Sequence, residues 1–564
     1  MKSSGHRSIS LIFLYAILLT VLPTLAACSS GAAPDFPPEN EGAPGDQNIG
    51  ERLFQDTRFA EYFATHMTGV NDPLAVGDPV VNQVQNVYAG PMPGPFAGQS
   101  INCRSCHFVI EFEGVPNAGN RTYADFTNRS PIPRELGGFT NTPRNAMQMV
   151  GSLAPRTVPT FLHFDGEFAT PQDLVKTTLT GRNFGWAPDE YQQAIAQIGQ
   201  VIRQDNGQSE LAANFGCGFS YQALFLGTDP KIPVSCQLPP QERLDVTSAS
   251  DEQIADAVAQ LIAQYMTGLM FKQDELGRYY ASPYDVFLRI NHLPVQPKAG
   301  QTPLQYAQSL YQQVLALSNP IFVDGTYGHF QYHAQPFQFG ATELAGLKIF
   351  LKAASGATDG SQHAGNCVAC HTPPNFTDFL FHNTGVAQEE YDAANGSGAF
   401  LALAIPTLAQ RLANYDAFLP ITPTHPNASE RFRHASVAGQ PQFADLGLWN
   451  VYQNADYPNP QSALTTVVCA NIQNCAVDQG LPSTIAQFKT PMLRDLEDSA
   501  PYFHNGSKLT FNDVVAFYIN SSQLARQGLL RNPPPEFQAM SISSADLDAL
   551  VAFLKSLTED YDDA

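Results

Sequence analysis

The sequence predicts a mostly α-helical protein with long loops and insertions. Residues 251–271, 302–317 and 543–558 carry apolar side chains at the i, i+3, i+4 and i+7 spacing of amphipathic helices. Runs in which apolar and polar residues alternate, the pattern of a strand, are few. Since the 564 residues include 43 prolines and 41 glycines, we expect loops to connect short regular elements. This length is enough for about two to four domains with sizeable cores.

Residues 1–27 have the pattern of a targeting segment. Lys2 and Arg7 precede an apolar run, LIFLYAILLTVLPTL, and small residues stand directly before Cys28. This order is typical of a bacterial lipoprotein signal, whose cleavage leaves a lipidated cysteine as the first residue. A plain secretory signal and an uncleaved membrane anchor are the alternatives. Residues 28–47 then predict a flexible tether, so we expect a lipid-anchored protein of the cell envelope, in the periplasm or on the outer membrane surface.

The charge of the chain bears on its partners. The formal net charge is −22, and no basic patch suggests binding of nucleic acid. Such acidity favours a cationic soluble partner, although a solvated acidic surface is the commoner explanation.

Two short motifs, CRSCH and CVACH, have the C-x-x-C-H spacing of covalent c-type haem attachment. Two thiols one turn apart can reach the two vinyl groups on one edge of a porphyrin, and the adjacent histidine becomes the proximal iron ligand. A redox or zinc interpretation of the two CxxC pairs would leave both histidines unexplained. The sequence therefore predicts two covalently bound haem c groups. They would be held by Cys103, Cys106 and His107, and by Cys367, Cys370 and His371.

Four further cysteines remain besides Cys28. Outside the cytoplasm they should pair, most simply as Cys217–Cys236 and Cys469–Cys475, each of which closes a short loop. Free buried thiols are the alternative.

The two haem motifs lie 264 residues apart, which calls for two haem domains. We expect an N-terminal haem c domain over residues 48–204 and a C-terminal one over 342–564. Between them, residues 205–341 are expected to form an inserted region of helices and loops. The predicted architecture is thus mostly α, with two c-type cytochrome-like haem domains.

A series of motifs resembles those of bacterial di-haem cytochrome c peroxidases and the related MauG enzymes. GERLFQDTRF, CRSCH, PRNA, DGEF, CVACH, FTDFLFHNTGV, FKTPMLRDLEDSAPYFHNGS and LVAFLKSLT occur in the order of that family. The resemblance covers both haem domains and leaves out roughly residues 205–340 and 390–485, which look like insertions. It implies that the His107 haem reacts with peroxide or dioxygen, and that the His371 haem transfers electrons.

The resemblance also implies a second axial ligand for the His371 haem. In this family that ligand lies fourteen residues after the histidine of the PYxH block, and it is methionine in the peroxidases and tyrosine in MauG. Counting from His504 leads to Tyr518, whose tyrosinate would stabilise ferric and higher iron states. Tyr518 also belongs to an apolar helical stripe that begins at Phe511, so packing in a core is the alternative. Met540 is the second candidate ligand.

Around the His107 haem the sequence departs from the family. The distal histidine of the peroxidases would fall on Tyr123, so we expect an open distal face, as in MauG. Thr177 stands where the family has a distal glutamine, and no acid stands at the position of the distal glutamate. Asp189 and Glu190 lie nearby, and we expect Glu190 to supply the acid–base function.

The family's bridging tryptophan between the two haems is also missing. Phe164 stands at its position, and phenylalanine is much harder to oxidise. Only Trp186 and Trp449 are present in the chain, and we expect Trp186 to be the alternative relay.

The resemblance further implies one Ca²⁺ at the domain interface, with Asn145, Ser499 and Pro501 at the positions that supply oxygen ligands. The alternative is that Asn145 only caps a turn. Two other histidine patterns give weaker evidence of a functional role. His382 should position the backbone near the second haem, and the His329/His333 pair should have a surface or core role.

Taken with the motifs, the resemblance implies an exported enzyme that activates hydrogen peroxide at the His107 haem. Its electrons would come from a small donor protein, either a c-type cytochrome or a copper protein, or from a side chain of a protein substrate. Two alternatives stay open. One is a di-haem oxygenase of the rubber-oxygenase type that uses dioxygen, and the other is a non-catalytic electron-transfer cytochrome of the cell surface.

Overall fold

Helices make up most of the regular structure, as predicted. The computed structural model describes residues 44–86, 90–93, 96, 98–107, 129–136, 138–215, 217–354, 361–470, 472, 475, 477–497 and 499–561. The predicted signal segment, Cys28, Tyr123 and most of the predicted tether lie outside these residues. The chain divides into units of residues 1–35 and 36–564, and all that follows concerns the second unit.

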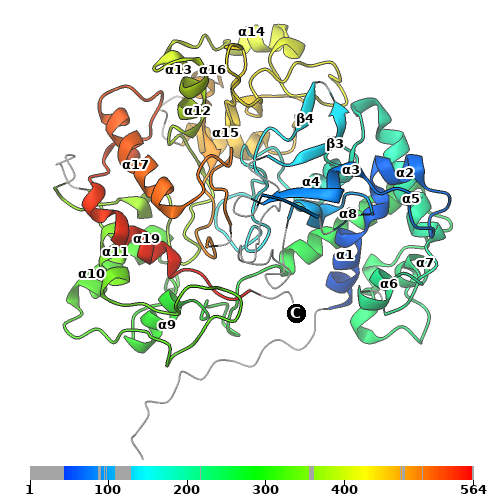
Figure 1. Cartoon of the computed structure of the whole chain (residues 1–564), viewed down its shortest axis with the longest axis horizontal. Helices are drawn as coiled ribbons and strands as arrows, with labels where there is room; N and C mark the ends of the chain where they lie inside the picture. The colour runs from blue at the N-terminus through cyan, green and yellow to red at the C-terminus, as the bar shows by residue number, and fades with distance from the viewer. Residues whose placement is uncertain are drawn as a thin grey trace, which may run out of the picture. The chain divides into compact units, whose positions relative to one another are not determined.

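The first hydrophobic core is built around helix α8, Asp251–Gly268. Ser250 caps this helix by accepting a hydrogen bond from the backbone N–H of Gln253, and the side chain of Gln253 accepts one in return. Helices α1, α4 and α5 pack against α8 (Figure 1). The predicted helix over 251–271 is confirmed, and it packs with the N-terminal helices although it was expected in the inserted region. The helices of this part are α1 Gly45–Gln55, α2 Glu61–His66, α3 Pro79–Asn82, α4 Pro171–Leu179, α5 Tyr191–Gln204, α6 Glu210–Phe215, α7 Tyr221–Leu226 and α8.

A second core joins helices from the middle of the chain to its C-terminal end. Helix α11, Ala341–Leu351, lies side by side with α19, Leu547–Lys555 (Figure 1). The predicted helices over 302–317 and 543–558 are confirmed as α10 and α19. The remaining helices here are α9 Pro283–Ile290, α10 Pro303–Ala316, α17 Phe511–Arg526 and α18 Pro535–Gln538.

A third core lies mainly within the segment that the family motifs do not cover. Trp449 is fully buried there, with the guanidinium of Arg411 4.9 Å from the centre of its ring. Phe161 precedes the DGEF motif and Phe381 belongs to the FTDFLFH motif. Both are part of the same core and connect it to the haem-motif regions. Its helices are α12 Val386–Asn395, α13 Ala399–Ala402, α14 Leu408–Ala413, α15 Gln461–Cys469 and α16 Val477–Gly480.

The strands of the described residues form three two-stranded antiparallel sheets. The pair β5–β6 positions a site, because it sets Phe381 opposite Lys489 and His382 opposite Phe488. It thereby joins the segment after CVACH to the FKTP block. The strands are β1 Gln83–Asn86, β2 Gly90–Pro93, β3 Pro131–Leu136, β4 Phe139–Asn141, β5 Phe381–His382 and β6 Phe488–Lys489.

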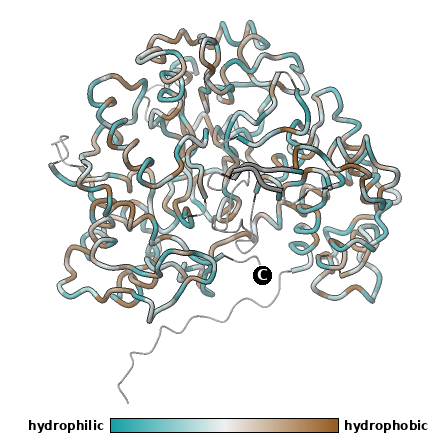
Figure 2. The backbone as a smooth tube through the Cα atoms, viewed as in Figure 1, coloured by the Kyte–Doolittle hydropathy of each residue, from teal (hydrophilic) through white to brown (hydrophobic). Residues whose placement is uncertain are grey.

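Both predicted disulfides are formed. The S–S distances are 1.99 Å for Cys217–Cys236 and 2.09 Å for Cys469–Cys475. Along the backbone, hydrophobic stretches are short and alternate with hydrophilic ones (Figure 2). None of the described helices is long and apolar enough to cross a membrane. The limits of the two haem domains remain predictions.

The close crossing of α11 and α19 gives a test of the second core. A Cβ atom added at Gly346 would lie 1.9 Å from the carbonyl oxygen of Ala549. Gly346→Ala must push the helices apart, so we expect it to lower the free energy of unfolding by about 1–3 kcal/mol. Gly325→Ala is the matched control, because no atom lies within 4 Å of the added Cβ. Thermal unfolding of the holoprotein compares the two, and equal Tm values would contradict the crossing.

Candidate functional site

Both C-x-x-C-H motifs fold into the same tight turn. A 3₁₀ turn covers Cys103–Ser105 in one and Cys367–Ala369 in the other. The backbone N–H of His107 donates to the carbonyl of Cys103 over 3.0 Å, and that of His371 to the carbonyl of Cys367 over 2.8 Å. None of the four motif cysteines forms a disulfide. The thiols are therefore free for the two thioether bonds that each haem c needs.

Each motif histidine is held by a backbone carbonyl. Nδ1 of His107 lies 2.8 Å from the carbonyl oxygen of Met147, and Nδ1 of His371 lies 2.9 Å from that of Phe376. A carbonyl only accepts, so Nδ1 carries the proton and Nε2 keeps its lone pair. Burial lowers the pKa of His107 to about 4 and also lowers the pKa of His371. Both imidazoles are thus neutral, the form that binds a metal.

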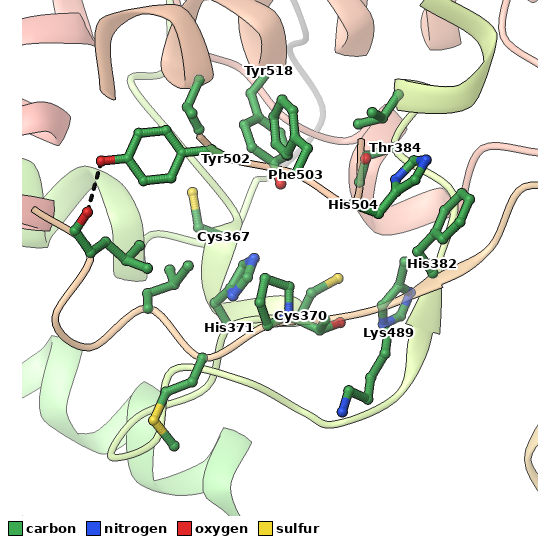
Figure 3. A pocket seen from close by; sticks show the side chains of 18 of the residues that line it. Cys367, Cys370, His371, His382, Thr384, Lys489, Tyr502, Phe503, His504 and Tyr518 are labelled. Carbon is green, nitrogen blue, oxygen red and sulfur yellow. Dashed lines mark hydrogen bonds between the residues drawn. The ribbon is translucent and has the colours of Figure 1, made fainter. Parts of the chain in front are cut away.

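His371 opens onto a cavity of about 230 Å³, which we call the second cavity. Cys367 and Cys370 line it together with His371, and Tyr518 of α17 lies on the side facing them (Figure 3). The apolar stripe of α17 lines the same cavity, so the stripe and Tyr518 face one space. Met540 lines it as well.

The Tyr518 hydroxyl is suited to a metal. Among the described residues it has no hydrogen-bond partner, and its ring is held between those of Phe503 and Phe537, with centroid distances of 6.1 and 5.9 Å. Burial raises the pKa of Tyr518, so the phenol needs a nearby cation to ionise. A ferric iron held by His371 would supply that charge.

Two buried basic side chains also line the second cavity. His504 stacks on Phe488 with ring centroids 3.5 Å apart, and its Nε2 atom is buried without a hydrogen-bond partner. Lys489 donates from Nζ to the carbonyl of Phe161 over 3.0 Å. Burial, reinforced by the charge of Arg156, lowers the pKa of Lys489 to about 7. An orphaned donor and an ammonium group fit a cofactor that carries carboxylates, as haem does.

His107 opens onto a larger cavity of about 690 Å³, the first cavity. Thr177 and Trp186 line it as well, and Trp186 Nε1 donates to the carbonyl of Phe59 over 3.1 Å. Glu190 does not line it. Its carboxylate accepts from the backbone N–H of Ala187 over 2.7 Å and pairs with Arg134. The structure therefore brings His107 and Trp186 to one cavity and keeps Glu190 outside its wall.

The two cavities share a wall. Asn145, Ala146, Met147 and Phe164 line both of them. Phe164, at the position of the family's bridging tryptophan, lies with its ring centroid 6.2 Å from that of His504. Met147 also accepts the hydrogen bond of His107. The two candidate haem sites are therefore adjacent.

Sequence reasoning missed several functional candidates in the first cavity. His163 stands two residues before the DGEF motif and Glu167 belongs to it; at this i, i+4 spacing their side chains meet, with Nδ1 2.9 Å from Oε2. That spacing was the only local signal. The segment outside the family motifs also contributes to the cavity wall. Its lining residues are Ile421, Thr422, Pro423, Pro426, Glu430, Arg433, Asp456, Tyr457, Pro458, Asn459 and Pro460.

The expected calcium ligands are only partly brought together. Nδ2 of Asn145 donates to the carbonyl of Pro501 over 2.6 Å, while its Oδ1 atom is buried without a partner. Oγ of Ser499 donates to the carbonyl of Asp495 over 2.8 Å. The Asn145 amide thus contacts the carbonyl that a cation would share, and calcium stays a prediction.

The other histidines follow expectation. His382 lies in β5 with Nε2 2.7 Å from Oδ2 of Asp378, and it lines the second cavity. His333 is buried with Nε2 3.0 Å from the carbonyl oxygen of Glu559, and His329 is exposed. The His329/His333 pair is structural, as predicted.

Comparisons with known proteins agree with the motifs. No family model matches the chain. Over 198 residues it is 28% identical to the cytochrome-c peroxidase IdrP2 of Denitromonas iodatirespirans, which is 34% of this chain and 36% of that protein. It is 28% identical over 194 residues to the IdrP2 of Pseudomonas sp. (strain SCT), with the same coverage. The aligned part thus spans about a third of the length of these relatives.

Solved structures were found with broad coverage and low similarity. The di-haem peroxidase BthA from Burkholderia thailandensis is 16% identical, with a TM-score of 0.41 over 92% of this chain and 88% of that one. A MauG-like protein associated with microbial copper homeostasis is 15% identical, with a TM-score of 0.41 over 94% of each chain. The relationship to cytochrome-c peroxidases rests on the sequence comparisons, which confirm the predicted resemblance to these enzymes over about a third of the chain.

Proposed function

We propose that this chain is an exported di-haem c-type oxidoreductase that activates hydrogen peroxide at the His107 haem. The His371 haem would relay or store the electrons. One observation carries the proposal: each C-x-x-C-H turn presents a neutral histidine, fixed by a backbone carbonyl, to its own cavity, and the two cavities share a wall.

Each haem would be held by its own motif. Cys103, Cys106 and His107 would hold one, and the other would be held by Cys367, Cys370 and His371, with Tyr518 as the second axial ligand. Haem iron supplies the redox chemistry and the site at which peroxide reacts. The chain supplies covalent attachment, neutral ligands and buried surroundings, which together set the reduction potential.

The two cavities suit different roles. The second is smaller, and Tyr518 lies on its side facing His371, as expected for an electron-transfer site in which both sides of the iron are occupied. The first is larger and has polar side chains in its wall, including His163, Glu167 and Thr177. Room and polar groups beside His107 favour the binding of a small oxidant there.

Electrons would enter from a soluble partner. The net charge of −22 favours a cationic donor, such as a small c-type cytochrome or copper protein, and would speed its encounter at low salt. A protein substrate with an oxidisable side chain is the other source of electrons.

We further propose that the chain is held at the cell envelope by a lipid on Cys28 and that a calcium ion binds between Asn145 and Pro501.

A second candidate function has its own support. Several residues between 421 and 460, outside the family motifs, form part of the wall of the first cavity, whose volume is about 690 Å³. Such room would admit a bulky apolar substrate, as a dioxygen-dependent oxygenase of the rubber-oxygenase type requires. Oxygen consumption with a hydrophobic polymer and no peroxide would favour the oxygenase. A plain electron carrier would instead be inert to peroxide, cyanide and CO.

Addition of hydrogen peroxide to the fully oxidised holoprotein tests the proposal. We expect one equivalent to cause an immediate loss of ferric Soret absorbance, because the distal side of the His107 haem is open without prior reduction. A reduced donor protein should reverse this loss. An unchanged spectrum would contradict an open, peroxide-reactive first site. The half-reduced protein is the control that separates a peroxidase requiring activation from a carrier.

Replacement of Tyr518 tests whether its hydroxyl is a ligand of the His371 haem iron. Tyr518→Phe removes the phenol oxygen and leaves the ring contacts with Phe503 and Phe537, so the fold should be kept. We expect a changed resting ferric spectrum and a reduction potential of that haem higher by on the order of 100 mV, since the anionic ligand is lost. Met540→Leu is the matched control, and a spectral change in that variant alone would make Met540 the ligand.

A further inference from the structure

The loop that carries His163 is rigidly built. Leu162 and Phe168 pair as an antiparallel bridge, with the N–H of Leu162 2.9 Å from the carbonyl oxygen of Phe168. Within the loop, His163 and Gly166 have φ values of +61° and +73°. A histidine in the left-handed region is uncommon, and such backbone conformations cluster at functional sites. The left-handed conformation therefore points the His163 side chain in a direction that a residue with negative φ would not give at this position.

His163 is held by a chain of charged side chains. Its Nδ1 atom lies 2.9 Å from Oε2 of Glu167. Both oxygens of Glu167 also accept from Arg433, over 3.2 Å between Nη1 and Oε1 and over a shorter contact to Nη2. Burial alone would raise the pKa of Glu167, but the charge of Arg433 outweighs it and holds that pKa well below its usual range.

This arrangement sets the proton positions on His163. An ionised carboxylate only accepts hydrogen bonds, so Nδ1 must donate to Glu167. The exchangeable position is then Nε2, which has no hydrogen-bond partner among the described residues. His163 lines the first cavity and is one-third exposed, while Glu167 behind it is buried. The pair has the arrangement of a histidine base oriented by a carboxylate.

The first cavity otherwise lacks the acid–base groups expected from the family. Thr177 lines it but cannot exchange protons near neutral pH, and Glu190 is bound to Arg134 outside the wall. We propose that His163 is the acid–base residue of the first cavity and that Glu167 and Arg433 are its positioning residues. The inference rests on the proposed function, because it assigns the proton transfer that peroxide cleavage requires.

The step is balanced in protons and electrons. Nε2 of His163 accepts the proton of the peroxide oxygen nearer the haem and passes it to the other oxygen as the O–O bond breaks. That oxygen leaves as water, and His163 returns to its neutral form. The oxygen nearer the haem takes up two electrons, supplied by the protein's redox centres and replaced by the reduced donor protein, together with two protons from the solvent, and becomes a second water. General acid–base catalysis of this kind contributes roughly 10²–10⁴-fold.

A metal site is the competing interpretation of the same cluster. The ligand atoms of His163, Asp165 and Glu167 lie within 4.8 Å of one another. However, Arg144 pairs with Asp165 over 2.6 Å, and Arg433 pairs with Glu167. Each of these carboxylates thus already contacts a guanidinium group, which disfavours a further cation and favours a proton-transfer role for His163.

Ligand binding to the holoprotein tests the proposal apart from turnover. Hydrogen cyanide must lose a proton when it binds as the anion, whereas CO carries none, so only cyanide needs a base. His163→Asn removes the base, and asparagine tolerates the left-handed backbone conformation. We expect about 100-fold slower cyanide association and peroxide reaction, with CO binding to the reduced protein within about twofold of wild type. Glu167→Gln should slow cyanide association by a smaller factor and also leave CO binding unchanged.

The chain offers a matched control. His425 pairs with Asp456 in the same way, with Nδ1 2.8 Å from Oδ2, and has a similar exposed fraction, but it does not line the first cavity. His425→Asn should therefore leave cyanide, peroxide and CO reactions unchanged.

Each outcome is decisive. Unchanged cyanide and peroxide rates in His163→Asn would overturn the proposal, as would a loss of CO binding of the same size, which would mark His163 as structural. A wild-type protein that binds CO and cyanide but ignores peroxide would contradict the proposed function alone, and slower cyanide binding in His163→Asn would still support the base. Binding of neither ligand by the wild type would overturn both.

Discussion

The arrangement of the two sites depends on one short segment, residues 144–147, which comprises the last three residues of the PRNA motif and Met147. The carbonyl of Met147 accepts the hydrogen bond that fixes His107. Asn145 donates from its backbone to the carbonyl of His504 over 2.7 Å and from its side chain to that of Pro501 over 2.6 Å. Arg144 pairs with Asp165 and Asp445. One segment therefore connects the first site, the DGEF loop, the PYFH block and the segment outside the family motifs.

Buried ion pairs, including those of Arg144, fix the segment outside the family motifs to the motif regions. Asp445 accepts two hydrogen bonds from Arg144, over 2.6 and 2.8 Å, and Arg433 supplies the partner of Glu167. All of these groups are nearly fully buried. Removing one partner of a buried ion pair leaves an uncompensated charge, at a cost of about 3–5 kcal/mol. The segment thus contributes both to the wall of the first cavity and to the stability of the DGEF loop.

Features set by local spacing could be predicted from the sequence. The C-x-x-C-H turns need only neighbouring residues, and α17 begins at Phe511, where its apolar stripe begins. Tyr518 was proposed from a fixed count that starts at His504, shortly before α17, and both disulfides close short loops. These features depend on contacts within about one or two helical turns, or within one loop. They can therefore be predicted from the order of the residues along the chain.

The features that the sequence missed depend on distant partners. Glu190 was expected at the reactive site because it stands in the chain near the position of the family's missing distal glutamate, but Arg134 of β3 and the N–H of Ala187 hold it outside the cavity wall. The His163–Glu167 pair was visible as a spacing. Its meaning depends on Arg433, 266 residues beyond Glu167, which only the packed structure brings alongside.

The shared wall also constrains how electrons would pass between the sites. Trp186 lines the first cavity and not the second, and its indole N–H donates to Phe59, so it does not lie between them. Phe164 does lie in the wall, but phenylalanine is hard to oxidise and would not hold a charge. A continuous path remains through one hydrogen bond and the backbone, from the His107 imidazole to the Met147 carbonyl and on to the second cavity. Transfer along it would be direct tunnelling through the wall, which requires only that residues 144–147 keep the two sites adjacent.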